Sequence, residues 1–118
     1  IVIDFGNLSN TKIFEIMFLN LDCTNNRIFI NNFFNMPNLD YLSMRNNSIG
    51  NNDLDNTKTN LSHISNLIVL ELSHNCLRFV RKNHFSNFIY LNDLDLSFNQ
   101  LEFIDYDSFS INDLRKLY

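Results

Sequence analysis

The sequence predicts an α/β solenoid, a right-handed coil with a short parallel β-sheet on its concave face and irregular or short helical segments on its convex face. The main observation is one eight-residue pattern written four times, in which two apolar residues, an asparagine and a third apolar residue stand at fixed positions. The copies begin at steps of 21, 28 and 24 residues and occupy residues 21–28, 42–49, 70–77 and 94–101. An apolar residue also stands three positions before each copy, at Phe18, Leu39, Leu67 and Leu91. Four copies in one frame are typical of stacked repeats.

The first half of each pattern predicts a short strand. In the third copy, Leu70 and Leu72 alternate with Glu71, so the leucines face inward and the glutamate faces outward. One repeat cannot bury its apolar face alone, so neighbouring repeats are expected to stack and share one elongated core. Parallel strands are therefore expected near residues 20–23, 41–44, 69–72 and 93–96.

The asparagine of each pattern is expected to lie inside the coil. The chain must leave each strand by a tight bend, which turns backbone donors and acceptors away from water, and an asparagine side chain can bond to both. Asparagine is frequent, at 22 of 118 residues, but this abundance does not explain its fixed register with the leucines. The pattern therefore predicts a structural ladder of Asn26, Asn47, Asn75 and Asn99.

These residues together resemble the leucine-rich repeat pattern L-x-x-L-x-L-x-x-N-x-L. The third repeat continues through Val80, Phe85 and Phe88, which is similar to the "typical" 24-residue subclass of these repeats. The unequal repeat lengths resemble the ectodomains of Toll-like receptors and related invertebrate extracellular immune proteins.

The resemblance implies a non-catalytic protein that recognises a ligand, as part of an innate-immune or cell-surface receptor. Such a protein would be a glycoprotein in signal transduction, located outside the cell or in the ectodomain of a membrane protein. The alternative is a cytoplasmic leucine-rich repeat scaffold that mediates protein–protein assembly. An enzyme that carries such repeats is a third class.

The repeats divide the chain into one array with a less regular beginning. Residues 1–17 are expected to form a degenerate repeat or an N-terminal flank, where Ile13 and Ile16 are candidate strand positions without an asparagine in register. The repeats occupy residues 18–118, as 18–38, 39–66, 67–90, 91–113 and the start of a fifth at 114–118. The sequence has no cysteine cluster of the kind that caps extracellular arrays and no signal peptide, so a fragment of a larger protein is expected.

Composition narrows the function further. The formal net charge of −4 and the pI near 5.1 disfavour a broad nucleic-acid-binding surface. No apolar run approaches the roughly 18–20 residues that span a bilayer. The histidines lack metal-ligand spacing, and the two glycines cannot form a phosphate-binding loop. The sequence therefore predicts no catalytic residues, no metal and no cofactor, and it leaves the oligomeric state open.

The two cysteines are not expected to pair. Cys23 occupies an inward strand position, where it is expected to act as a small buried hydrophobic residue. Cys76 stands in the bend after Asn75. Because two repeats separate the cysteines, strand spacing alone would place them roughly 10 Å apart, beyond the reach of a disulfide.

The outward strand positions define the expected binding surface for a protein or other macromolecular partner. Exposed apolar side chains beside acids are typical of a protein-binding footprint, and the acids would attract a basic partner. The adjacent Asp93 and Asp95 are interpreted as solvated charges rather than as a catalytic pair. The candidate binding residues of the concave face are Tyr41, Arg45, Val69, Glu71, His74, Asp93, Asp95 and Phe98.

Three sequons mark candidate glycosylation sites at Asn7, Asn46 and Asn60. Asn60 lies in the polar insertion of the long second repeat and is expected to be the most accessible. A glycan on Asn46 would lie at the rim of the concave face and direct partners toward the flanks or the C-terminal repeats.

Overall fold

The computed structural model describes residues 2–3, 8–17, 23, 29–30, 36–51, 64–110 and 114–118. Each turn of the chain adds one short strand to a parallel sheet, which confirms the predicted solenoid. The described residues contain no α-helix, so the convex segments are irregular there, which is one of the two forms that the sequence allows.

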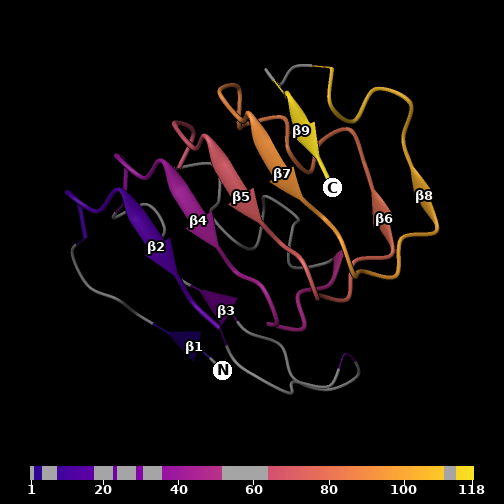
Figure 1. Cartoon of the computed structure of the whole chain (residues 1–118), viewed down its shortest axis with the longest axis horizontal. Helices are drawn as coiled ribbons and strands as arrows, with labels where there is room; N and C mark the ends of the chain where they lie inside the picture. Colours follow the sequence, from indigo (N-terminus) through magenta and orange to yellow (C-terminus); the bar gives the residue numbers. More distant parts are fainter. Residues whose placement is uncertain are drawn as a thin grey trace.

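The main sheet has five parallel strands in the order β2-β4-β5-β7-β9, which lie side by side in Figure 1. The central leucine of each pattern pairs with the next, so Leu42 is the partner of Leu70, and Leu70 is the partner of Leu94. The strands are β2 (Ile13–Glu15), β4 (Tyr41–Ser43), β5 (Val69–Glu71), β7 (Asp93–Asp95) and β9 (Lys116–Leu117).

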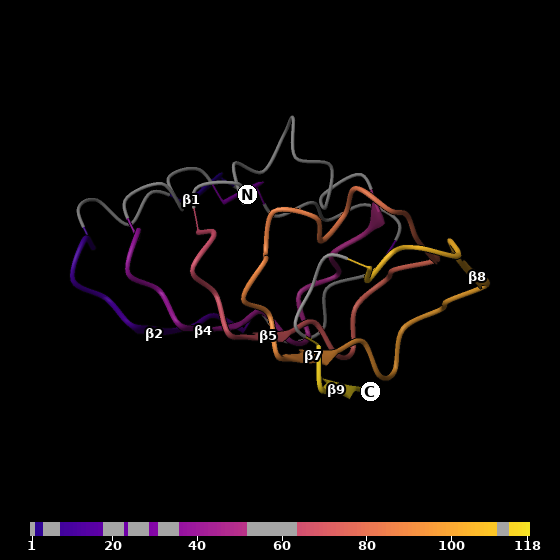
Figure 2. The same ribbon diagram turned by 90° about the horizontal axis from the view of Figure 1, so that it is seen from above.

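Two small parallel pairs complete the set of strands. β6 (Phe79–Val80) pairs with β8 (Phe103–Ile104), and β1 (Val2–Ile3) pairs with β3 (Phe29–Ile30). The main sheet lies along one side of the coil and the β1 segment lies on the other (Figure 2). The coil therefore has one regular face, the sheet, and one irregular face.

The first strand of the sheet is not the expected one near residues 20–23. β4 pairs instead with β2, in which Phe14 is the partner of Leu42, and Ile16 continues the ladder by donating its N–H to the Ser43 carbonyl at 2.9 Å. Residues 20–22 lie outside the described residues, and Cys23 lies in a turn. Phe14 stands 28 residues before Leu42, the same step that separates Leu42 from Leu70. The parallel ladder therefore follows an equal spacing rather than the shorter step that the first pattern indicated.

The core is the stack of inward side chains from successive repeats. Leu42, Leu70 and Leu94 are at most 1% exposed, and burying each such side chain contributes about 1.5–3 kcal/mol. On the irregular side, Phe85 packs against Phe88 with ring centroids 6.4 Å apart. Since successive repeats share these layers, no repeat is buried without its neighbours.

The three described asparagines of the predicted ladder bond to backbone groups of neighbouring turns. Asn75 is 5% exposed, and its Oδ1 accepts hydrogen bonds from the N–H groups of Asn47 and Ile49 at 3.0 and 2.9 Å. Its Nδ2 donates to the carbonyl groups of Met44, Leu72 and Ser73. Each bond satisfies a bend group that the packed core keeps from water.

The other two repeat the arrangement one turn away on either side. Asn47 donates to the Ile16 carbonyl at 2.8 Å, and Asn99 accepts from the Leu77 N–H at 3.0 Å. Asn26 lies outside the described residues.

The expectation of two unpaired cysteines is wrong. Cys23 and Cys76 form a disulfide with a Cα–Cα distance of 5.8 Å, within the ordinary range for such a bond. Cys23 is not an inward strand residue but lies exposed in a turn, so strand spacing does not determine its distance from Cys76. The disulfide joins the N-terminal part of the chain to the bend of the third repeat.

Candidate functional site

The outward side chains of the main sheet form one surface, which we call the sheet face. Strand pairing places Tyr41, Val69 and Asp93 in one row across β4, β5 and β7. These three side chains are half-buried, whereas Leu70 and Leu94 between the rows are buried. The sheet face therefore offers partly shielded side chains rather than a layer of fully solvated ones.

A second row carries most of the negative charge of the sheet face, and we call it the acid row. It consists of Glu15, Ser43, Glu71 and Asp95, which strand pairing places side by side. The sequence analysis expected Asp22 at the position that Glu15 holds, because it placed the first strand seven residues later.

Glu71 is the most shielded acid of this row. Its Oε2 is buried and has no hydrogen-bond partner among the described residues, whereas Oδ1 of Asp95 accepts a bond from the Ser97 N–H at 2.9 Å. A buried carboxylate oxygen without a donor is costly, so Glu71 retains the capacity to accept from a charged donor.

Tyr41 responds to the same negative charge. Burial, the hydrogen bond with Glu71 and the charges of Glu71 and Glu15 together raise the pKa of Tyr41 above its ordinary value of 10.0. The phenol therefore keeps its proton throughout the physiological range and is a hydrogen-bond donor beside the acid row.

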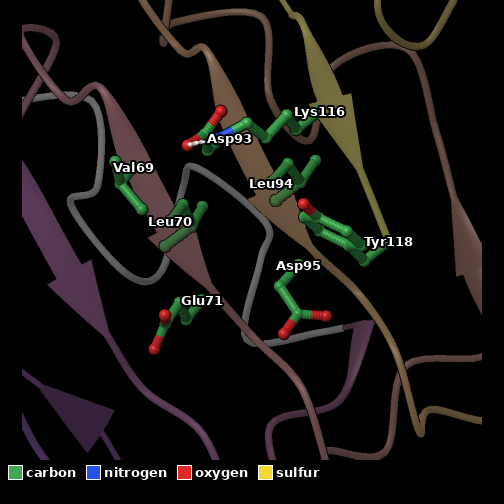
Figure 3. A pocket seen from close by; sticks show the side chains of 8 residues that line it. All are labelled: Val69, Leu70, Glu71, Asp93, Leu94, Asp95, Lys116 and Tyr118. Carbon is green, nitrogen blue, oxygen red and sulfur yellow. Dashed lines mark hydrogen bonds and ion pairs between the residues drawn. The ribbon is translucent and has the colours of Figure 1, made fainter.

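A pocket of about 120 Å³ opens on the sheet face between β5, β7 and β9 (Figure 3). Lys116 reaches from β9 toward β7, where its Nζ lies 3.3 Å from Oδ2 of Asp93. Glu71 and Asp95 lie farther along their strands and have no such partner in the picture. The pocket is lined by Val69, Leu70, Glu71, Asp93, Leu94, Asp95, Lys116 and Tyr118.

The sequence analysis missed Lys116 and Tyr118 as members of this surface. The signal was present, since Leu114 and Leu117 open a fifth strand, but the side-chain positions depend on the pairing of Lys116 with Asp93.

The remaining predicted residues lie past the strand ends, along what we call the rim. His74 and Phe98 have backbone φ angles of 55° and 54°, in the left-handed region that bulky residues rarely adopt. Their rings stack with centroids 4.2 Å apart and an interplanar angle of 7°. Arg45 is exposed beside Asn46, whose φ angle is 58°. The eight predicted residues therefore form two groups, five on the sheet face and three at the rim.

The predicted modification and metal residues are placed as follows. Asn46 is half-buried at the rim, and Asn7 and Asn60 lie outside the described residues. Of the histidines, His84 is buried and its Nδ1 accepts a bond from the Arg81 N–H at 3.3 Å. His63 is not described. In the part of the chain that the structure describes, no three His, Cys, Asp or Glu residues are grouped so that they could hold a metal ion.

Membrane-spanning helices were also sought. Among the residues with described positions, no helix has the length and apolar character needed to cross a bilayer.

The parallel sheet, the inward leucines and the asparagine bonds together define a β-solenoid with turns of about 24 residues, consistent with leucine-rich repeats. Among solved structures, the fold is similar to that of internalin C2 from Listeria monocytogenes, with a TM-score of 0.59 and 23% sequence identity. The match covers 94% of this chain and 42% of the internalin chain, so this chain spans less than half of that structure. No family model and no curated protein matches the sequence.

Proposed function

We propose that the chain is a non-catalytic recognition module that binds a protein partner through the sheet face and the adjoining rim. The main support is Glu71, a shielded acid with an unpaired oxygen beside a pocket that also contains apolar Val69. Hot spots of protein interfaces combine such shielded polar groups with apolar anchors. The proposed contact residues are Tyr41, Arg45, Val69, Glu71, His74, Asp93, Asp95 and Phe98.

The partner is basic where it meets the acid row. Three of the four side chains in this row are acids, and none of them forms an ion pair among the described residues. On β7 and β9, the one described ion pair of this surface uses Lys116 to neutralise Asp93 and leaves Asp95 free for a partner. Like-signed charges along one groove speed the approach of an opposite charge and make association dependent on salt.

The proposed setting is extracellular, as part of a cell-surface or innate-immune receptor of the Toll-like kind. The disulfide between Cys23 and Cys76 supports an oxidising compartment, because such bonds persist mainly in secreted proteins and ectodomains. The sequons at Asn7, Asn46 and Asn60 are compatible with a glycoprotein.

The binding test uses a double variant, Asp95→Lys with Phe98→Ala, in the full chain. Proteins captured by the immobilised chain are titrated one by one against wild type and variant by calorimetry at two salt concentrations. We expect the double variant to bind about tenfold or more weakly and to show less salt dependence, because it loses an anchor and reverses a charge. Asp95→Lys alone should account for the change in salt dependence.

The matched control changes the same chemistry on the irregular side. Glu102→Lys with Tyr106→Ala also reverses one acid and removes one exposed aromatic ring, but these residues flank β8. Unchanged affinity in the first double variant, or equal losses in both, would place recognition on another face.

A further inference from the structure

The rim contains a repeating backbone position whose side chains project in register. Asn46, His74 and Phe98 have φ angles of 58°, 55° and 54° and belong to three successive repeats. The Asn46 N–H donates to the Ser73 carbonyl and the His74 N–H to the Ser97 carbonyl, so each turn is hydrogen-bonded to the next in the same way. Left-handed conformations at residues other than glycine carry strain, and such strain gathers at functional sites.

Two members of this series already form a stack. The rings of His74 and Phe98 are almost parallel, with centroids 4.2 Å apart, although Phe98 is 74% exposed. The repeat spacing of the coil thus sets two side chains at the distance of an offset aromatic stack.

Asn46 leaves the next place in the stack empty. An open pocket of about 280 Å³ lies there, and its wall includes the His74 ring and the disulfide. A ring placed over Asn46 would lie on His74 as His74 lies on Phe98. The space is sufficient, since an apolar cavity of roughly 150 Å³ binds benzene. The lining residues are Cys23, Asn46, Ser48, His74, Asn75, Cys76 and Phe98.

The chemistry of the lining favours an uncharged planar group with a polar edge. No carboxylate, lysine or arginine lines the pocket, so it offers no partner for an ionic ligand. The Asn46 Nδ2 donates only to the Met17 thioether, at 3.5 Å, among its described bonds. A thioether is a weak acceptor, so this amide can turn toward a better one, such as a hydroxyl.

We propose that this pocket, the aromatic slot, receives an aromatic side chain of the protein partner, tyrosine by preference. The proposal rests on the proposed function and adds to it the chemistry of the anchor. The ring would extend the stack of His74 and Phe98, and its hydroxyl would bond to Asn46. The disulfide holds one wall of the slot in place before binding, which reduces the ordering cost of association.

The test needs no partner protein, so its failure is distinct from failure of the proposed function. The full chain, produced without glycosylation because a glycan on Asn46 would fill the slot, is titrated with p-cresol and followed by NMR. We expect saturable shifts of the His74 and Phe98 ring signals. His74→Asn should weaken binding by about three- to tenfold, since asparagine tolerates the left-handed turn but removes the stacking ring.

Two further variants make the result specific. Asn46→Phe should fill the slot with the chain's own ring and abolish binding of p-cresol. Tyr90→Asn removes an aromatic ring that is 57% exposed but does not line the slot, and it should leave binding unchanged. The circular dichroism spectrum of each variant shows whether its fold is retained.

Methyl β-glucoside and butylguanidinium are titrated in parallel as a sugar and a cationic probe. Saturable binding of either probe in place of p-cresol would overturn the aromatic assignment. The same holds if no probe binds the folded chain, or if His74→Asn binds p-cresol as wild type does.

Discussion

Replacing Asn75 with alanine is expected to lower the free energy of unfolding by about 3 kcal/mol or more. The side chain is 5% exposed and bonds to five backbone groups of three successive bends. Alanine cannot replace any of these bonds, and each buried group left unpaired costs about 1–3 kcal/mol. Urea unfolding followed by circular dichroism measures the change, with the m-value showing whether the transition stays comparable.

Asn66→Ala is the matched control. Asn66 is exposed, and its one described side-chain bond is to the Pro37 carbonyl at 3.1 Å. Its removal should cost about 1 kcal/mol or less. Similar losses in the two variants would contradict the inward position of Asn75.

Removing the disulfide is expected to destabilise the chain by about 4 kcal/mol. Cys23 and Cys76 close a loop with a sequence separation of 53 residues, and the chain-entropy model gives about this value for a loop of that length. The double variant Cys23→Ala with Cys76→Ala should therefore unfold at markedly lower urea concentration than the oxidised wild type.

Reduced wild-type protein provides the comparison without a change of sequence. It should unfold close to the double variant, while the variant itself should not respond to a reducing agent. Free thiols in the folded, unreduced wild type would contradict the pairing.

The fold could be predicted because its main determinant is periodic. Leu42, Leu70 and Leu94 recur with an asparagine at a fixed distance, and strands β4, β5 and β7 lie where that pattern predicts them. The alternation of side chains within a strand then determines which residues face out, so Val69 and Glu71 could be assigned to the surface from the sequence.

The first strand could not be located in the same way. β2 has the apolar alternation of Phe14 and Ile16 but no asparagine in register, whereas residues 21–28 imitate the complete pattern. The ladder with β4 depends on equal spacing between repeats, and spacing is not visible when one repeat lacks its marker.

The disulfide and the rim were beyond a pattern-based prediction for a related reason. The distance between Cys23 and Cys76 depends on the path of an irregular segment, and strand counting gives no information about such a path. The stack of His74 on Phe98 depends on left-handed turns, which the residue types disfavour. The binding role of the sheet face and the rim stays a proposal, although strand pairing brings its acids together.

Carboxylate footprinting of the partner complex tests the central claim most directly. The chain, free and bound to a captured partner, is labelled with a carbodiimide and glycine ethyl ester and analysed by peptide mass spectrometry. We expect binding to protect Glu71, Asp93 and Asp95 on the sheet face and to leave Glu102, beside β8, labelled to the same extent. Protection of Glu102 with unchanged labelling of the three acids on the sheet face would contradict recognition through that face.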